Sequence, residues 1–130
     1  MDCREKLIAA GKRMLEKKLT VETWGNLSIR EGESGLIYLT PSAVAYHTIE
    51  PEDVAVVAPD GKILSGRRKP TVEKQLHLDL YRARPEINAI IHTHPVQSQV
   101  FAVLRREIPP IILSVARKVP AWAMVSSCSF

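Results

Sequence analysis

Apolar side chains recur at intervals of three and four positions between Arg4 and Lys18, and charged side chains occupy most positions between them. This spacing places one set of residues along a single face of an α-helix. The positions that share the face are Leu7, Ile8, Gly11, Met14, Leu15 and Lys18. We therefore predict an amphipathic helix that packs on a sheet.

The pattern then changes to the alternation that is typical of β-strands. Residues 26–30 (NLSIR) and 36–40 (LIYLT) are two extended runs, and the loop 31–35 (EGESG) joins them. Pro41 and Ser42 end the second run. We predict a hairpin from these segments.

A second strand pair follows the same logic. Residues 54–58 (VAVVA) form an apolar run that is typical of a buried strand, and Pro59–Lys62 is a tight-turn sequence. Because Ile63 and Leu64 follow the turn directly, the strand, turn and strand predict another antiparallel hairpin.

Helical spacing returns after Pro70. We predict a helix over residues 72–84 capped by Thr71, a strand over residues 87–92 and a helix from Pro95 to about Leu104. The first of these helices has a face at helical spacing that comprises Val72, Leu76, Leu80 and Ala83. An initial helix, mainly antiparallel strands and then α-β-α predict an α/β sandwich rather than a doubly wound parallel sheet.

Composition narrows the class of protein. The 130 residues suit one domain, and 45% hydrophobic with 25% charged residues is ordinary for a globular chain. No apolar run approaches a membrane span and the N-terminus is charged, which favours a cytoplasmic protein. The net charge of +4 suits an anionic small molecule, whereas 5% aromatic residues and no recognisable module argue against nucleic acid. Cys3 and Cys128 are interpreted as reduced and without a catalytic role.

The sharpest local signal is His92-Thr93-His94 at the end of a predicted strand. Residues i and i+2 of a strand project to the same face, so two imidazoles become available to one metal ion. Taken alone, the pattern also fits two surface histidines beside a loop.

Two further residues extend that signal. Glu73 lies in the first turn of the helix that leads to the His92 strand, where it either joins the histidines or only favours the helix dipole. His77, one turn later on the same face, either joins the site or is a core or supporting histidine. His47 is assigned no role.

Three loops have the features of a small-anion site. They are Gly25-Asn26, Thr40–Ala43 and Lys69–Val72, with Arg67 and Arg68 beside the last one. Main-chain N–H groups and hydroxyls at a helix start suit phosphate. The alternative is that these are ordinary turns next to a solvated basic run.

These segments, taken together and in order, resemble the class II aldolase/adducin family, in particular the L-fuculose-phosphate aldolase type. The resemblance runs from the first helix to about Pro110. The matching segments are Trp24–Arg30, Leu39–Ala43, Asp53-Val54, Pro59–Lys62, Pro70–Glu73 with His77, Tyr81–Pro85 and Ala89–Pro95.

The resemblance implies a three-layer sandwich with a mainly antiparallel central sheet flanked by helices. It implies one Zn²⁺ per protomer bound by Glu73, His92 and His94, with Glu73 also acting as general acid and base. The implied reaction is retro-aldol cleavage of a phosphorylated ketose, such as L-fuculose 1-phosphate, through a metal-stabilised enediolate. The implied assembly is a homotetramer with sites at subunit interfaces. The implied phosphate-binding residues are Gly25, Asn26, Thr40, Ser42, Ala43, Thr71 and Val72.

The chain departs from the family pattern in three places. Val72 replaces a serine and removes a hydroxyl from the phosphate loop. Ala43 replaces a glycine, so we expect an adjusted turn if that glycine has a positive φ. The family's third zinc histidine lies beyond the H-x-H, and no histidine follows His94. We interpret residues 1–112 as a family domain that is incomplete at its C-terminal side, and residues 113–130 as a divergent, truncated or frame-shifted tail.

Other readings remain open within this frame. A sugar-phosphate epimerase, dehydratase or decarboxylase uses related chemistry, although Glu73 favours the aldolase type over the epimerase type, which has an aspartate there. An inactive truncated form is a second reading. A non-catalytic, adducin-like binding domain is a third, which retention of Glu73, His92 and His94 disfavours.

Overall fold

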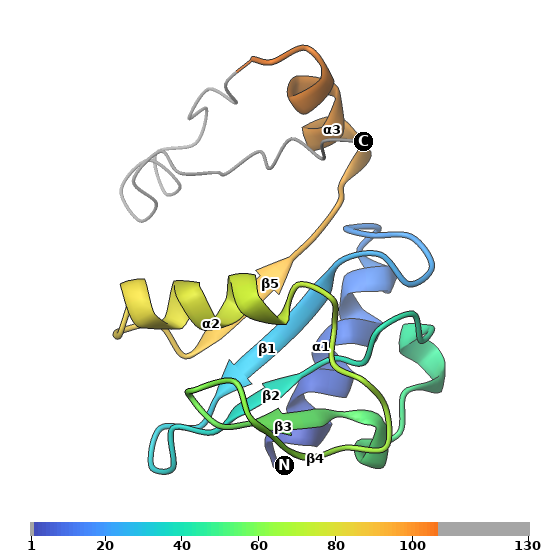
Figure 1. The fold of residues 1–130 in the computed structure, drawn as a ribbon. Helices are drawn as coiled ribbons and strands as arrows, with labels where there is room; N and C mark the ends of the chain where they lie inside the picture. The colour runs from blue at the N-terminus through green and yellow to red at the C-terminus, as the bar shows by residue number, and fades with distance from the viewer. Residues whose placement is uncertain (1, 107–130) are drawn as a thin grey trace. The chain divides into compact units, whose positions relative to one another are not determined.

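The strands form one antiparallel sheet in the order β4-β3-β2-β1-β5 (Figure 1). The computed structural model describes residues 2–106, which fall into two units, residues 2–93 and residues 94–106. The strands are β1 (Asn26–Arg30), β2 (Ile37–Leu39), β3 (Ala55–Val57), β4 (Ile63–Ser65) and β5 (Ala89–His92). Both predicted hairpins are confirmed, since β1 pairs with β2 and β3 pairs with β4, each in antiparallel fashion.

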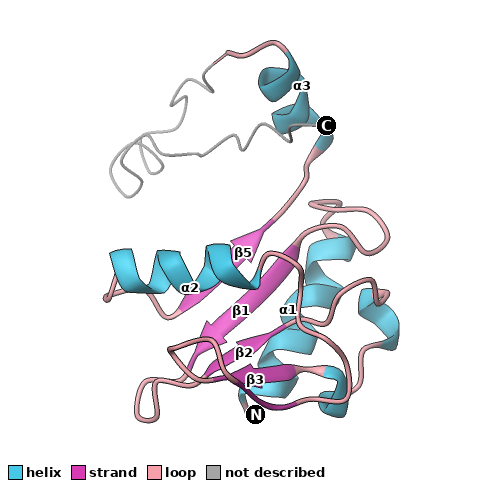
Figure 2. Cartoon of the chain, in the orientation of Figure 1, coloured by secondary structure: helices cyan, strands magenta, loops and turns pink. Residues whose placement is uncertain are grey.

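Helix α1 (Cys3–Glu16) covers one face of this sheet (Figure 2). Its start is fixed by a capping box, in which Asp2 accepts from the Glu5 N–H and Glu5 accepts from the Asp2 N–H. Its buried residues are Leu7, Gly11 and Met14, which confirms most of the predicted face. They pack on Leu27 of β1, the residue that alternation turns toward α1. The prediction that Lys18 shares this face is wrong, because the helix ends at Glu16 and Lys18 is exposed.

Helix α2 (Lys74–Ala83) covers the opposite face of the sheet (Figure 1). It contributes Leu78 and Tyr81 to a second core with Ile37, Leu39 and Val57. The expected antiparallel sheet flanked by helices is confirmed by this layering.

The predicted start and inner face of α2 are wrong. The helix begins at Lys74, Glu73 is its N-cap residue, and Val72 is 88% exposed. The buried residues are His77, Leu78 and Tyr81. Two contacts delay the helix: the Thr71 N–H donates to the Thr40 carbonyl at 3.0 Å, and Pro70 bridges to Pro41. Residues 70–71 are thereby tied to the end of β2 and cannot join a helical turn.

Two 3₁₀ turns connect β2 to β3, η1 (Tyr46–Thr48) and η2 (Pro51–Asp53). Tyr46 is buried against α1, and the Arg4 guanidinium donates to the Pro51 and Val54 carbonyls at 2.6 and 3.0 Å. These contacts bind the connection to the first helix.

The second unit contains α3 (Val96–Val103), which follows Pro95 as predicted. The Gln99 side chain donates to the His94 carbonyl at 3.1 Å within this unit. The predicted boundary at residue 112 and the predicted tail 113–130 lie outside the described residues. Within residues 2–106, the helices are all too short or too polar to cross a bilayer.

Candidate active site around Glu73 and His92

Glu73 and His92 come from different elements and meet on the α2 face of the sheet. The His92 Nδ1 and the Glu73 Oε2 are 2.6 Å apart. Glu73 precedes α2 and His92 ends β5, so the helix-turn-strand return brings Glu73 to one of the two histidines, which is part of one alternative that the sequence left open. The side chains are 36% and 22% exposed respectively, which leaves the pair accessible to solvent.

Gly25 allows the end of β5 to lie against the start of β1. A Cβ at this position would stand 2.4 Å from the His92 carbonyl oxygen, and the residue has a φ of +71°. Only glycine meets both requirements without strain. The Tyr46 hydroxyl donates to the Gly25 carbonyl at 2.8 Å, and burial raises the pKa of Tyr46 to about 12. Gly25 therefore sets the position of His92 through the main chain.

Asn26 is paired with His92 across β1 and β5, and its amide lies beside Glu73. Its Nδ2 donates to the Glu73 Oε2 at 2.5 Å, and its Oδ1 is 2.5 Å from the His77 Nε2. Asn26 is only 5% exposed. The predicted contact of Asn26 with phosphate stays a prediction, and the structure adds a contact with the carboxylate.

His77 is fully buried beneath this cluster. Its Nδ1 is 2.6 Å from the Ser28 hydroxyl, which in turn is 2.8 Å from the Tyr81 hydroxyl. Burial, followed by the positive charge that His92 can carry, lowers the pKa of His77 to about 4. Of the two readings left open by the sequence, the structure favours a supporting histidine that reaches Glu73 through Asn26. Ser28 and Tyr81 carried no functional prediction. The sequence does contain a feature that could have revealed them. Ser28 lies on the strand face that α2 covers, and His77 and Tyr81 are four residues apart on one face of that helix.

Two of the predicted anion loops lie side by side. The Ser42 N–H donates to the Lys69 carbonyl at 3.0 Å, beside the bond from Thr71 to Thr40 described above. The Thr71 hydroxyl accepts from the Glu73 N–H at 3.3 Å, so this loop leads directly into the site. Ala43 has a φ of +55°, so alanine occupies a left-handed conformation in this turn. That the turn is adjusted relative to the family glycine stays a prediction.

Arg67 and Arg68, which lie near these loops, are bound to a residue outside them. Arg67 and Arg68 form ion pairs with Asp53 at 2.8 and 3.4 Å. The Glu50 N–H, and then the Arg67 guanidinium, hold the pKa of Asp53 below its usual range. Both cations stabilise the η2 connection, and the hypothesis that they add charge to an anion site gains no support from these contacts.

His94 belongs to the second unit, and its role as a metal ligand stays a prediction. Among the residues that the structure describes, no group of three or more His, Cys, Asp or Glu side chains is arranged to hold a metal ion. The pair of donors that the first unit brings together is Glu73 and His92.

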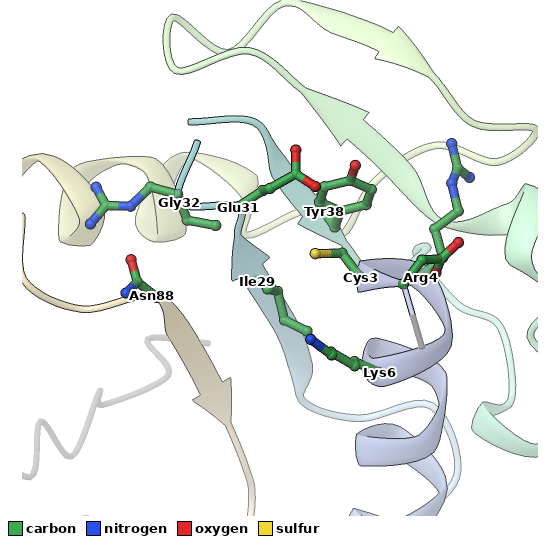
Figure 3. Close-up of a pocket in the computed structure, with 10 residues that line it drawn as sticks. Cys3, Arg4, Lys6, Ile29, Glu31, Gly32, Tyr38 and Asn88 are labelled. Atoms are coloured by element: carbon green, nitrogen blue, oxygen red, sulfur yellow. The ribbon is translucent and has the colours of Figure 1, made fainter. Parts of the chain in front are cut away.

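A separate hollow of about 450 Å³ lies where α1 meets β1 and β2 (Figure 3). Its walls include Cys3, Lys6, Tyr38 and Arg30. The Arg30 guanidinium donates to the Tyr81 and Ile87 carbonyls at 3.3 and 2.6 Å. Its hydrogen bonds therefore stabilise the fold by joining β1 to α2 and to the segment between α2 and β5. None of the predicted site residues lines this hollow.

Comparison with known proteins identifies the class. The family model described as "Class II Aldolase and Adducin N-terminal domain" matches residues 5–124. The chain belongs to the class II aldolase and adducin family.

Individual relatives refine the comparison. A 5-deoxy-D-ribulose 1-phosphate aldolase of Bacillus thuringiensis serovar kurstaki is 41% identical over 87% of this chain and 53% of its own length. An L-ribulose-5-phosphate 4-epimerase of Salmonella paratyphi B is 38% identical over 72% of this chain and 41% of its own. The solved structure of an L-fuculose 1-phosphate aldolase superposes with a TM-score of 0.80 at 38% identity, covering 83% of this chain and 51% of that one. The chain therefore spans about half the length of the relatives it matches.

Proposed function

We propose that this chain carries the acid–base part of a zinc-dependent lyase that cleaves a phosphorylated ketose resembling L-fuculose 1-phosphate by a retro-aldol reaction. The observation that carries the proposal is the 2.6 Å contact between the Glu73 carboxylate and the His92 imidazole beside two polar loops. A carboxylate held at the start of a helix and open to solvent is suited to moving a proton to and from a bound substrate.

The residues of the first unit fit part of a zinc site. Zinc takes imidazole nitrogen and carboxylate oxygen as ligands, and Glu73 and His92 present both donor types in contact with each other. The proposed ligands are Glu73, His92 and His94, with one ion per protomer. When bound, the metal would supply Lewis-acid polarisation of the hydroxy-ketone oxygens.

The chain's own residues have separate roles in the proposal. Glu73 transfers the proton, and Asn26 holds its carboxylate in place through the Nδ2 donor. The loops at Thr40–Ala43 and Thr71-Val72, which main-chain hydrogen bonds join, hold the phosphate together with Gly25 and Asn26. Because the Thr40, Ser42 and Thr71 N–H groups are bonded within the fold, the proposed donors to phosphate are the Ser42 and Thr71 hydroxyls.

An epimerase acting on a related sugar phosphate is the second candidate. It is favoured by the 38% identity to the L-ribulose-5-phosphate 4-epimerase. Glu73 favours the lyase, because the epimerase type carries an aspartate at this position. Product analysis separates the two: a lyase releases two shorter compounds, and an epimerase returns an isomer of equal mass.

The experiment begins with zinc, measured per protomer after dialysis of the chain against a zinc buffer. We expect close to one zinc in the chain and almost none in the His92→Ala/His94→Ala variant. His47→Ala is the matched control. His47 lies in η1 and is not among the proposed ligands, so its substitution should leave the zinc content unchanged. Zinc that survives in the double variant, or a folded chain that binds none, would contradict the proposal.

Activity is then measured as cleavage of L-fuculose 1-phosphate. The Glu73→Gln variant keeps the size of the side chain and removes its ability to exchange a proton. We expect it to lower kcat by a factor of about 10² to 10⁴. Unchanged turnover would assign the proton transfer to another group.

A further inference from the structure

Five side chains form one continuous line of hydrogen bonds that ends on the proposed catalytic carboxylate. The line begins at the buried Tyr81 hydroxyl and passes through Ser28, His77 and Asn26 to Glu73. Each contact lies between 2.5 and 2.8 Å. Tyr81, Ser28, His77 and Asn26 are all at most 5% exposed, so water does not compete for these groups.

The chemistry of the line fixes the direction of every hydrogen. An ionised carboxylate only accepts, so the nitrogen and not the oxygen of the Asn26 amide faces Glu73. The Asn26 Oδ1 then requires a donor, which is the Nε2–H of His77. A neutral imidazole with its proton on Nε2 accepts at Nδ1, and Ser28 donates there. The Ser28 oxygen in turn accepts from the Tyr81 hydroxyl.

The burial of the line agrees with this direction. His77 stays neutral because burial lowers its pKa to about 4, and a neutral ring offers one donor and one acceptor. Burial also raises the pKa of Tyr81, so its hydroxyl keeps the proton that it donates. His92, approaching from the other side, donates its Nδ1–H to the same Glu73 oxygen.

We propose that His77 is a positioning residue: its Nε2–H locks the Asn26 amide in the one orientation that donates to Glu73, and so holds the carboxylate ready for proton transfer. The inference rests on the proposed function of Glu73. With no donor at this point, the Asn26 amide is free to turn over. Its oxygen would then face the carboxylate, and two acceptors would repel each other.

Two substitutions at one buried position separate positioning from mere packing. In His77→Gln the side-chain amide reaches the place of Nε2 and retains a donor to Asn26. In His77→Asn the amide reaches the place of Nδ1, so it retains a partner for Ser28 and lacks the donor to Asn26. Both variants exchange a buried ring for a buried amide, so a purely structural role predicts similar behaviour for both.

The first readout is nuclear magnetic resonance of the metal-free chain and requires no activity. In the unsubstituted chain we expect His77 as the neutral Nε2–H tautomer at pH 7, together with slow exchange of the Asn26 side-chain N–H. His77→Gln should keep the slow exchange and His77→Asn should lose it. A protonated His77 ring, the Nδ1–H tautomer, or equal Asn26 signals in both variants would overturn the inference.

The second readout is catalysis by the zinc-loaded chain. Because supporting residues of this kind change activity by about 10- to 100-fold, we expect His77→Asn to lower kcat by that factor with little change in KM. His77→Gln should recover most of the loss, and equal losses in both variants would count against a positioning role. If the unsubstituted chain fails to cleave the ketose, the proposed function fails, while the resonance data still decide the orientation of Asn26.

Discussion

The two faces of the sheet differ in how they are built, although strand β1 serves both. Toward α1 the core is almost wholly apolar, with Leu7, Met14 and Leu27 at its centre. Toward α2 the core is apolar beside β2 and β3 and polar beside β1, where Asn26 and Ser28 point inward. Alternation along one strand therefore supplies packing on one side and chemistry on the other.

The polar part of the α2 face, which comprises Asn26, Ser28, His77 and Tyr81, is stable only if each buried polar atom has a hydrogen-bond partner. Throughout residues 2–106, every buried side-chain nitrogen and oxygen has a hydrogen-bond partner. A buried polar group that loses its partner costs about 1–3 kcal/mol, whereas apolar contacts are not directional. We expect the free energy of unfolding to depend on side-chain volume at the α1 face. At the α2 face we expect it to depend on pH and on which atoms donate hydrogen bonds.

The largest effect should come from removing volume on the apolar side. Leu7→Ala should lower the free energy of unfolding by about 2–5 kcal/mol, because Leu7 is fully buried and leaves a cavity. Urea unfolding measures the loss. Lys12→Ala, on the exposed side of the same helix, is the control and should change stability by less than about 0.5 kcal/mol. Similar losses in the two variants would show that this face is not tightly packed.

Acidification should act on the polar side. His77 has a pKa of about 4 in the fold and 6.5 when exposed, so the unfolded chain binds a proton first as the pH falls. The contribution of His77 is fully present above pH 6.5 and is lost progressively toward pH 4, by about 3 kcal/mol in total. Unfolding free energies of the unsubstituted chain and of His77→Gln, compared across this range, isolate the effect. A constant difference between them would contradict it.

A smaller effect is expected where the two strands of the site meet. Gly25→Ala should cost about 1–2 kcal/mol for the left-handed backbone, with a further loss from the contact with the His92 carbonyl. The midpoint temperature of thermal unfolding and the zinc content per protomer should both fall, because the substitution displaces His92. Gly32→Ala is the control, because a Cβ there meets nothing within 4 Å. Gly25→Ala would sharpen the comparison by displacing His92 without removing apolar volume from the core on α1.

The smallest effect should be a gain. Ala43 occupies a left-handed conformation with a φ of +55°, which glycine adopts without a steric penalty. Ala43→Gly should raise the free energy of unfolding by about 0.5–1 kcal/mol. The control is Ala45→Gly, at a φ of −64°, which should lower stability by a similar amount. A loss at Ala43 would mean that the methyl group packs favourably in the turn.

Local patterns were sufficient to predict most of the elements. The first helix, predicted over residues 4–18 and observed over Cys3–Glu16, both hairpins and the strand that ends at His92 follow from periodicity and turn residues within short windows. The contact of Glu73 with His92 was one of two alternatives for Glu73, and the return of a strand after a helix made it possible. The assignment to the aldolase and adducin family is confirmed by the family match over residues 5–124.

Contacts between distant segments determined what the patterns missed. The start of α2 is delayed by Thr40, which the sequence does not connect with Thr71. Ser28 determines the buried face of α2, because its hydroxyl forms hydrogen bonds with the His77 ring and the Tyr81 hydroxyl when both side chains point inward. Ala43 keeps its left-handed φ because the main chain of Ser42 is bonded to Lys69, which holds the turn from outside.

The position of β5 also governs the order in which the molecule can assemble. Strands β1 to β4 pair with their neighbours in sequence, so the pairing of this meander does not require β5. β5 arrives only after α2 and closes the edge of β1 opposite β2. Until then that edge presents unpaired main-chain groups, which favour association with other strands. His92 reaches Glu73 in this closing step, so a nascent or partly opened chain can hold a complete meander and still lack the site.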